Sequence, residues 1–105
     1  MFGGGGNMAG MMKKVQKLQA DMAKLQEELK ASVIEVSTGG GAVKVEITGE
    51  KKIRSIKIAP SAVDPEDVEM LQDLVVAAVG EAQRQAETAM SDGMERITKG
   101  LNLPF

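Results

Sequence analysis

The 105-residue chain contains no cysteine, histidine, tryptophan or tyrosine, and its two aromatic residues are Phe2 and Phe105. Without cysteine there is no disulfide framework, and without cysteine or histidine the usual zinc and iron–sulfur sites are excluded. The acidic cluster around Asp64 lacks the alternating oxygen ligands of a calcium loop, and helix capping explains it. We therefore expect no metal and no cofactor.

The same shortage argues against catalysis. Serine and threonine hydroxyls are present, but no histidine could activate them as nucleophiles. The carboxylates fall on helix positions that are predicted to be exposed, where nothing would raise a pKa for acid catalysis. We predict that the protein is not an enzyme and has no small-molecule substrate.

Long apolar runs are also missing. No stretch approaches the ~18–20 uninterrupted apolar residues that span a bilayer. The opening Met1-Phe2, followed by four glycines, lacks the basic and apolar regions of a signal peptide. These features predict a cytoplasmic protein with no membrane partner.

Apolar residues recur in one regular series near the start of the chain. The spacing alternates between three and four residues, which is the a/d pattern of a coiled coil. The series is Met8, Met11, Val15, Leu18, Met22, Leu25 and Leu29. With Asn7 as N-cap, it predicts a helix from Met8 to Ser32, preceded by a flexible glycine-rich segment over residues 1–7. So narrow a seam is typical of a protruding arm.

Three β-strands are predicted next, over residues 33–38, 43–48 and 53–58. Val43, Val45 and Ile47 alternate with polar residues, which is the period-2 pattern of a half-buried strand. Ile56 and Ile58 are expected to face inward from the third strand. The short connections, one of them Gly39-Gly40-Gly41, predict an antiparallel meander.

A second long helix is predicted to begin at Asp64, as the N-cap, with Pro65 at its first position. It could extend to about Lys99, with a kink or an early end near Gly93 as the alternative. Its second half presents a seam of small residues suited to close packing against one helix. These are Ala82, Ala86, Ala89 and Gly93. Residues 101–105 are predicted to be an apolar, non-helical tail.

Together these elements predict an α+β fold with an α-β-β-β-α protomer, formed by one domain over residues 8–100. The two long helices would form an arm that protrudes beyond the three-stranded meander. Such a protomer has a thin core and leaves apolar surface and sheet edges exposed. We therefore predict a homodimer.

The net charge of −2 hides an asymmetry along the chain. Residues 1–32 hold five lysines against three acidic residues, whereas residues 59–105 hold three basic against nine acidic residues. Lys13, Lys14 and Lys17 lie near the free end of the first helix. If the last helix returns antiparallel, Arg96 and Lys99 reach the same tip. These five residues are our candidate DNA-binding residues, with Lys24 and Arg84 further along the arms.

The missing aromatic residues indicate which nucleic acid would bind. Proteins that bind single strands or RNA usually stack bases on aromatic side chains, and none lies in the predicted folded part. No recognition-helix pattern is present either. The charge pattern therefore favours double-stranded DNA, held by backbone contacts with little sequence preference.

The chain also resembles the YbaB/EbfC family along its whole length. The resemblance rests on Met1-Phe2-Gly3, Met11-Met12-Lys13, the Gln/Met/Leu repeat from Gln16 to Leu29, Gly40-Gly41 with Val43-Lys44-Val45, Gly49, Ile56-Lys57-Ile58 with Pro60, Glu69-Met70-Leu71-Gln72-Asp73-Leu74-Val75, and Leu103-Pro104-Phe105. It implies an α-β-β-β-α dimer whose helical arms protrude like tweezers. It also implies a nucleoid-associated protein of the cytoplasm that binds duplex DNA, without cofactor or catalysis.

Our first interpretation is thus a nucleoid-associated protein whose homodimer binds duplex DNA through basic arm tips and affects nucleoid organisation and gene expression. The alternative is a protein-interaction or scaffold module, in which the coiled-coil arms hold a partner helix. Salt dependence separates the two, because phosphate binding weakens steeply as ionic strength rises.

Overall fold

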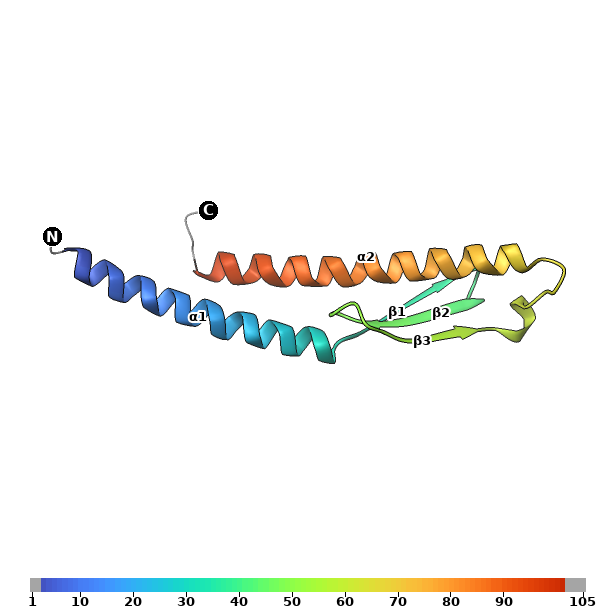
Figure 1. Cartoon of the computed structure of the whole chain (residues 1–105), viewed down its shortest axis with the longest axis horizontal. Coiled ribbons are helices and arrows are strands. Elements are labelled where there is room, and N and C mark those ends of the chain that lie inside the picture. The colour runs from blue at the N-terminus through green and yellow to red at the C-terminus, as the bar shows by residue number, and fades with distance from the viewer. Residues whose placement is uncertain (1–2, 102–105) are drawn as a thin grey trace.

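The computed structural model describes residues 3–101, with side-chain environments from Met8 to Gly100. The elements in chain order are helix α1 (Gly3–Ala31), strands β1 (Val33–Thr38), β2 (Val43–Thr48) and β3 (Ile53–Ile58), a short 3-10 helix η1 (Pro60–Ala62), and helix α2 (Val68–Leu101). Figure 1 shows the two helices extending from the sheet toward the same end of an elongated molecule, 77 × 22 × 15 Å in extent. The predicted α+β fold and its element order are confirmed.

The three strands form one antiparallel sheet in the order β1-β2-β3, at the predicted positions. The β1–β2 turn contains three consecutive glycines, Gly39, Gly40 and Gly41, with φ of 61°, 66° and 96°. Side chains with a Cβ rarely adopt this left-handed conformation, so the glycine run is what lets the hairpin close here.

The core lies between this sheet and α2, which packs over β1 and β2. Val43, Val45 and Ile47 project from β2 and are fully buried. The residues facing them from α2 are three alanines, Ala78, Ala82 and Ala86, also fully buried and four residues apart. A row of such small side chains on one face allows the helix to lie close to the sheet. A hydrogen bond from the Thr38 hydroxyl to the Leu74 carbonyl, 3.0 Å, ties the end of β1 to the same helix.

Strand β3 differs from the prediction that Ile56 and Ile58 face inward to a buried core. Both residues are on the α2 side of the sheet, because they pair directly with Val45 and Val43. However, α2 covers β1 and β2, and Ile56 and Ile58 stay 42% and 39% exposed. The alternation gave the correct face, but the single helix is too narrow to cover the third strand.

The start of α2 also differs from its prediction. The helix begins at Val68, and Asp67 is its N-cap: an Asp67 carboxylate oxygen accepts a hydrogen bond from the Met70 N–H at 3.2 Å. Asp64 instead forms a turn ahead of the helix, where its side chain accepts from the Glu66 N–H at 2.9 Å. Two aspartates three residues apart offer two possible caps, and the predicted choice of Asp64 was wrong.

The helix ends differ as well. Helix α1 begins at Gly3 rather than Met8, so Asn7 lies within the helix and is not its N-cap. Helix α2 continues through Gly93 to Leu101, and the early end considered near Gly93 does not occur. The predictions for Met1, Phe2 and residues 102–105 lie outside the described residues, and the domain boundaries remain predictions.

Candidate nucleic-acid interface

The arm is anchored where α1 meets the sheet. The Gly49 N–H, in the β2–β3 turn, donates to the Leu29 carbonyl at 2.9 Å and to the Ser32 hydroxyl at 3.2 Å. A Cβ at Gly49 would lie 2.7 Å from a Leu29 methyl carbon, so only glycine allows this approach. Leu29 itself is buried. These contacts fix the direction in which α1 leaves the body.

One turn further out, α1 packs tightly against α2. Leu25 is only 5% exposed, and it lies against the buried Gly93 of α2. A Cβ at Gly93 would collide with the Leu25 side chain. Of the small-residue seam predicted on α2, Gly93 serves this crossing with α1, whereas Ala82 and Ala86 pack against the sheet.

Beyond this crossing the seam of α1 becomes progressively uncovered. Leu18 and Met22 are half-buried, whereas Val15, Met11 and Met8 are 49%, 65% and 67% exposed. The reason is that α2 ends beside Lys17, which lines the same groove as Gly100. Residues 3–16 of α1, about 21 Å of helix, therefore project past α2, as Figure 1 shows. The protruding arm has two helices at its base and one at its tip.

The lysines of this single-helix tip have few acidic neighbours. Lys13 and Lys14 are exposed, and neither enters an ion pair within the described part of the chain. Lys17 pairs with Asp21 at 2.8 Å, and Asp21 is the first acidic residue of the sequence. The first turn of the α1 helix also contains no acidic residue.

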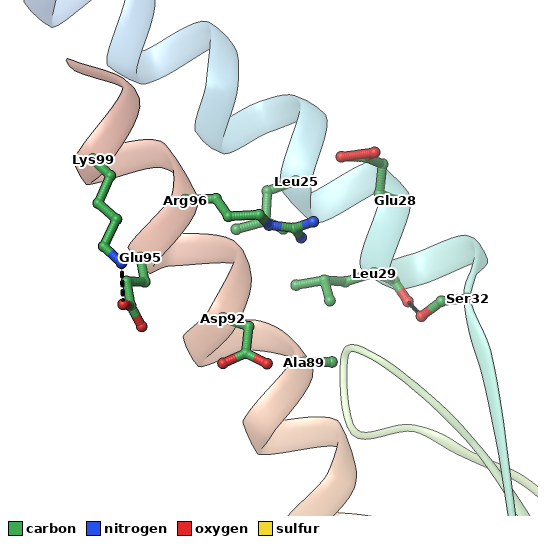
Figure 2. Close-up of a pocket in the computed structure, with 9 residues that line it drawn as sticks. All are labelled: Leu25, Glu28, Leu29, Ser32, Ala89, Asp92, Glu95, Arg96 and Lys99. Carbon is green, nitrogen blue, oxygen red and sulfur yellow. Dashed lines mark hydrogen bonds and ion pairs between the residues drawn. The ribbon is translucent and has the colours of Figure 1, made fainter.

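Arg96 and Lys99 lie nearer the sheet than the prediction assumed. They line a groove of about 570 Å³ between the helices, together with Leu25, Glu28 and other residues. In Figure 2 the Arg96 side chain extends from α2 toward Leu25, and Lys99 turns back to Glu95. Because α1 is the longer projection, the last turns of α2 meet the middle of α1 and not its tip.

This groove is not a positive site. Its carboxylates, from Glu28, Asp92 and Glu95, outnumber its two cations. The Lys99 ammonium is 2.8 Å from a Glu95 carboxylate oxygen, and this hydrogen bond lowers the pKa of Glu95 and raises that of Lys99. Lys99 thus stays charged but already has an anionic partner.

A second groove, of about 240 Å³, brings together cations from both helices. Lys17 and Lys24 come from α1 and Arg96 from α2, with Asp21 and Glu28 as the acidic neighbours. Lys24 was not among the five candidates, although it follows Lys17 by seven residues, the spacing of one helix face. Of the five, this groove gathers Lys17 and Arg96, whereas Lys13 lies four residues beyond Lys17, about 6 Å further out along α1.

Arg84, which was predicted to lie further along the arm, is held by its own helix. Its guanidinium donates to the Glu81 carboxylate, with 2.8 Å between Nε and Oε1. This hydrogen bond lowers the pKa of Glu81 to about 2. An exposed pair of this kind adds little stability, but it leaves Arg84 less free to bind a phosphate.

Two other kinds of site are absent from residues 3–101. No three acidic side chains gather there as the ligands of a metal ion. Neither helix is long and apolar enough to cross a membrane.

Comparisons with known proteins agree with one another and cover most of the chain. The model of a family described as the YbaB/EbfC DNA-binding family matches residues 4–101. A protein of Alkaliphilus metalliredigens is 54% identical over 98% of this chain and 90% of its own length, and one of Pelotomaculum thermopropionicum is 55% identical over 95% of each. Both are named nucleoid-associated proteins. The crystal structure of an uncharacterized Helicobacter pylori protein matches the fold with a TM-score of 0.74 at 20% identity, over 83% of this chain and 91% of that one.

Proposed function

Because the chain belongs to the YbaB/EbfC DNA-binding family, we propose that it binds duplex DNA as a homodimer through the tips of its α1 helices. Lys13 and Lys14 contact backbone phosphates, and Lys17 adds a third contact. The binding has little sequence preference and needs neither a cofactor nor a catalytic step. We also propose, from the names of its relatives, that the protein is associated with the nucleoid.

The observation that carries this proposal is the exposed, acid-free tip of α1. Lys13 and Lys14 project on a single helix that α2 does not accompany, and no carboxylate precedes Asp21. Their charges are therefore available to phosphates, which a protein binds with release of counterions. Residues 3–101 contain no aromatic residue on which an unpaired base could stack, which favours duplex over single strands.

The remaining candidates contribute less than the tip. Lys17 must exchange Asp21 for a phosphate, but an exposed pair of this kind is weak and is easily replaced. Lys99 forms a similar exposed ion pair with Glu95, and the two grooves that Arg96 lines also contain carboxylates. We rank these residues, with Lys24, as secondary contacts.

The homodimer is inferred from the apolar strip on β3. Ile53, Ile56 and Ile58 are 43%, 42% and 39% exposed, on the sheet face that α2 only partly covers. β3 is also an edge strand, with one row of backbone groups unpaired in the protomer. A second copy that packs on this strip would cover apolar surface that a monomer leaves in water.

The exposed seam of α1 favours a second candidate function, that of a protein-interaction module. Met8, Met11 and Val15 form a stripe on which a partner helix could lie. In that case polar substitutions in the stripe would abolish function, whereas removal of the tip charges would have little effect.

A duplex-DNA titration at two salt concentrations tests the proposal. It compares the wild type with Lys13→Ala/Lys14→Ala/Lys17→Ala and with a matched control, Lys44→Ala/Lys52→Ala/Lys57→Ala. The control removes three exposed lysines of the sheet region. Light scattering checks that each variant has the wild-type mass.

We expect the tip variant to lose most of its affinity and to flatten the salt dependence. The slope of log K against log salt is negative, and removal of one phosphate-binding lysine reduces its magnitude by about 0.9. The slope of the control variant should differ from the wild-type slope by no more than about 0.9. If the wild type does not bind at low salt, or if both variants bind equally well, the tip is not the DNA site. In the first case the protein-interaction function takes its place.

A further inference from the structure

The free edge of strand β1 has the properties of a pairing surface. Its sequence, Val33–Thr38, contains no lysine, arginine, proline or glycine, and its register with β2 is regular along the whole strand. Edge strands of native proteins usually carry such residues or a bulge, which discourage pairing with another chain. We propose that β1 pairs antiparallel with the β1 strand of a second copy of this chain. The pairing depends neither on DNA binding nor on the apolar strip of β3.

The opposite edge of the sheet shows the contrast. The register of β2 with β3 shifts between Glu46 and Ile47, which leaves Arg54 as an extra residue on β3. Lys57 lies on the same strand, and Pro60 follows it closely. A second strand could therefore not extend the ladder along β3 without interruption. The features that protect a sheet edge are present on β3 and missing from β1.

The backbone groups on the outer side of β1 are unpaired in the protomer. Thr48 donates its N–H to the Lys52 carbonyl at 2.8 Å, so the backbone of Thr48 points toward β3. Val33 lies opposite Thr48, and its backbone groups therefore point away from β2. The same holds for every second residue, Glu35 and Ser37, and within residues 3–101 no other element pairs with these groups. β1 thus offers a row of free N–H and C=O groups.

The side chains of β1 favour one register. The backbone groups of Glu35 and Ser37 point outward, so an antiparallel copy must place such residues opposite one another. Glu35 opposite the second copy's Glu35 would bring like charges together, which destabilises a strand pair. A shift of two residues places Glu35 opposite the second copy's Ser37, with Val36 opposite itself. The sheet already contains a pair of this kind, because the Ser55 hydroxyl donates to the Glu46 carboxylate across β2 and β3 at 2.9 Å.

The helices fit this arrangement. Helix α2 packs over β1 and β2, and the twofold axis would lie midway between the two β1 strands. The two α2 helices would then be about two strand spacings apart, roughly 9.6 Å, on the same face of the joined sheet. Packed helices are separated by about 8–10 Å. Because both long helices extend toward one end of the sheet (Figure 1), the reversed copies would send their arms in opposite directions.

The size of the contact determines when it forms. The two pairs of Glu35 with Ser37 would exchange about four backbone hydrogen bonds. An interface of one strand edge falls below the ~1,200 Å² that stable complexes bury. We therefore expect weak association of the free protein. Where homodimers form through the β3 strip, β1 pairing would join them into a chain, and binding to one duplex would raise their local concentration.

The absence of cysteine from the chain allows a direct test of the register by disulfide formation. Full-length Glu35→Cys and Ser37→Cys are oxidised mildly, each alone and as an equal mixture, and crosslinked chains are followed on non-reducing gels. Positions 35 and 37 of opposite copies would have Cα atoms about 5.5 Å apart, whereas two positions 35 would be about 9 Å apart. A disulfide spans the first separation and not the second. A mixture of Lys44→Cys and Glu46→Cys, on the central strand β2, is the matched control for chance collision.

We expect the mixture of Glu35→Cys and Ser37→Cys to crosslink on the order of tenfold faster than either variant alone and than the β2 control. Equal rates in all samples would overturn the proposal. Faster crosslinking of Glu35→Cys alone would overturn the assigned register. Either failure would leave the DNA-binding and homodimer proposals untouched, because neither uses the edge of β1.

A proline substitution gives an independent readout without new thiols. Ser37→Pro removes an N–H that the protomer does not use, and proline is tolerated where an edge strand faces solvent. Ser37→Ala keeps the N–H and is the matched control, and circular dichroism checks that each variant is folded. In light scattering at rising concentration, Ser37→Pro should need roughly tenfold more protein than the wild type to associate, and Ser37→Ala no more than about threefold. Equal association of the three proteins, or a wild-type mass that does not rise with concentration, would overturn the proposal.

Discussion

Replacement of Gly93 by alanine is expected to destabilise the protein, whereas the same replacement at Gly80 is expected to stabilise it. Both glycines lie within α2, so both replacements gain ~0.5–1 kcal/mol of helix propensity. A Cβ at Gly80 meets nothing within 4 Å, but a Cβ at Gly93 collides with Leu25. Overpacking of this kind costs ~1–3 kcal/mol. Gly93→Ala should therefore be ~1–3 kcal/mol less stable than Gly80→Ala.

Urea unfolding followed by circular dichroism measures this difference. All three proteins must be compared at one protomer concentration, because the stability of an oligomer depends on it. Leu25→Ala alone should cost about 2–5 kcal/mol because Leu25 is buried. Added to that variant, Gly93→Ala should no longer destabilise the protein, because the group that the new methyl meets is gone. If Gly93→Ala and Gly80→Ala stabilise the protein equally, α1 and α2 do not approach as closely as described.

Four further substitutions test three separate features of the molecule. Asp67→Ala should lower the free energy of unfolding by ~1 kcal/mol, because it removes the N-cap of α2. Asp64→Ala should lower it less. The urea midpoints of the two variants measure this difference in stability. Ile56→Asp should convert the dimer to a monomer in light scattering, since it places a charge in the proposed interface. Asp21→Asn should strengthen duplex binding at low salt by freeing Lys17, and an unchanged dissociation constant would show that Lys17 does not contact the DNA.

The strands could be predicted from sequence because their pattern is local. Val43, Val45 and Ile47 alternate with polar residues, and this period fixes both the strand and the face that it buries. The turn of three glycines and the other short connection then indicate an antiparallel meander, because short loops can join only antiparallel neighbours. The heptad seam of α1 is equally local, and it gave the correct packing face and a helix over the right part of the chain, although the helix begins earlier, at Gly3.

Features that depend on tertiary contact could not be predicted in this way. The exposure of Ile56 depends on the width of α2 over the sheet, which no local pattern encodes. The cap of α2 required a choice between Asp64 and Asp67, and both aspartates accept a backbone N–H in the structure, Asp64 in the turn and Asp67 at the helix start.

The candidate site was predicted in composition but not in arrangement. Lys13 and Lys14 are at the tip, as their sequence position implies. Arg96 and Lys99 were expected beside them. The lengths of two antiparallel helices do not reveal their stagger, that is, how far one helix is shifted along the other. The Leu25–Gly93 crossing sets that stagger, and it brings Arg96 to the level of Leu25 instead of the tip.

Chemical labelling of lysines tests the central claim most directly. The protein is acetylated with and without saturating duplex DNA at low salt, and the extent of reaction at each lysine is read by mass spectrometry. We predict that DNA protects Lys13 and Lys14 and leaves Lys44 and Lys57 of the sheet as reactive as in the free protein. Protection of the sheet lysines, with Lys13 and Lys14 still reactive, would contradict the account and move the DNA-binding surface away from the tip of α1.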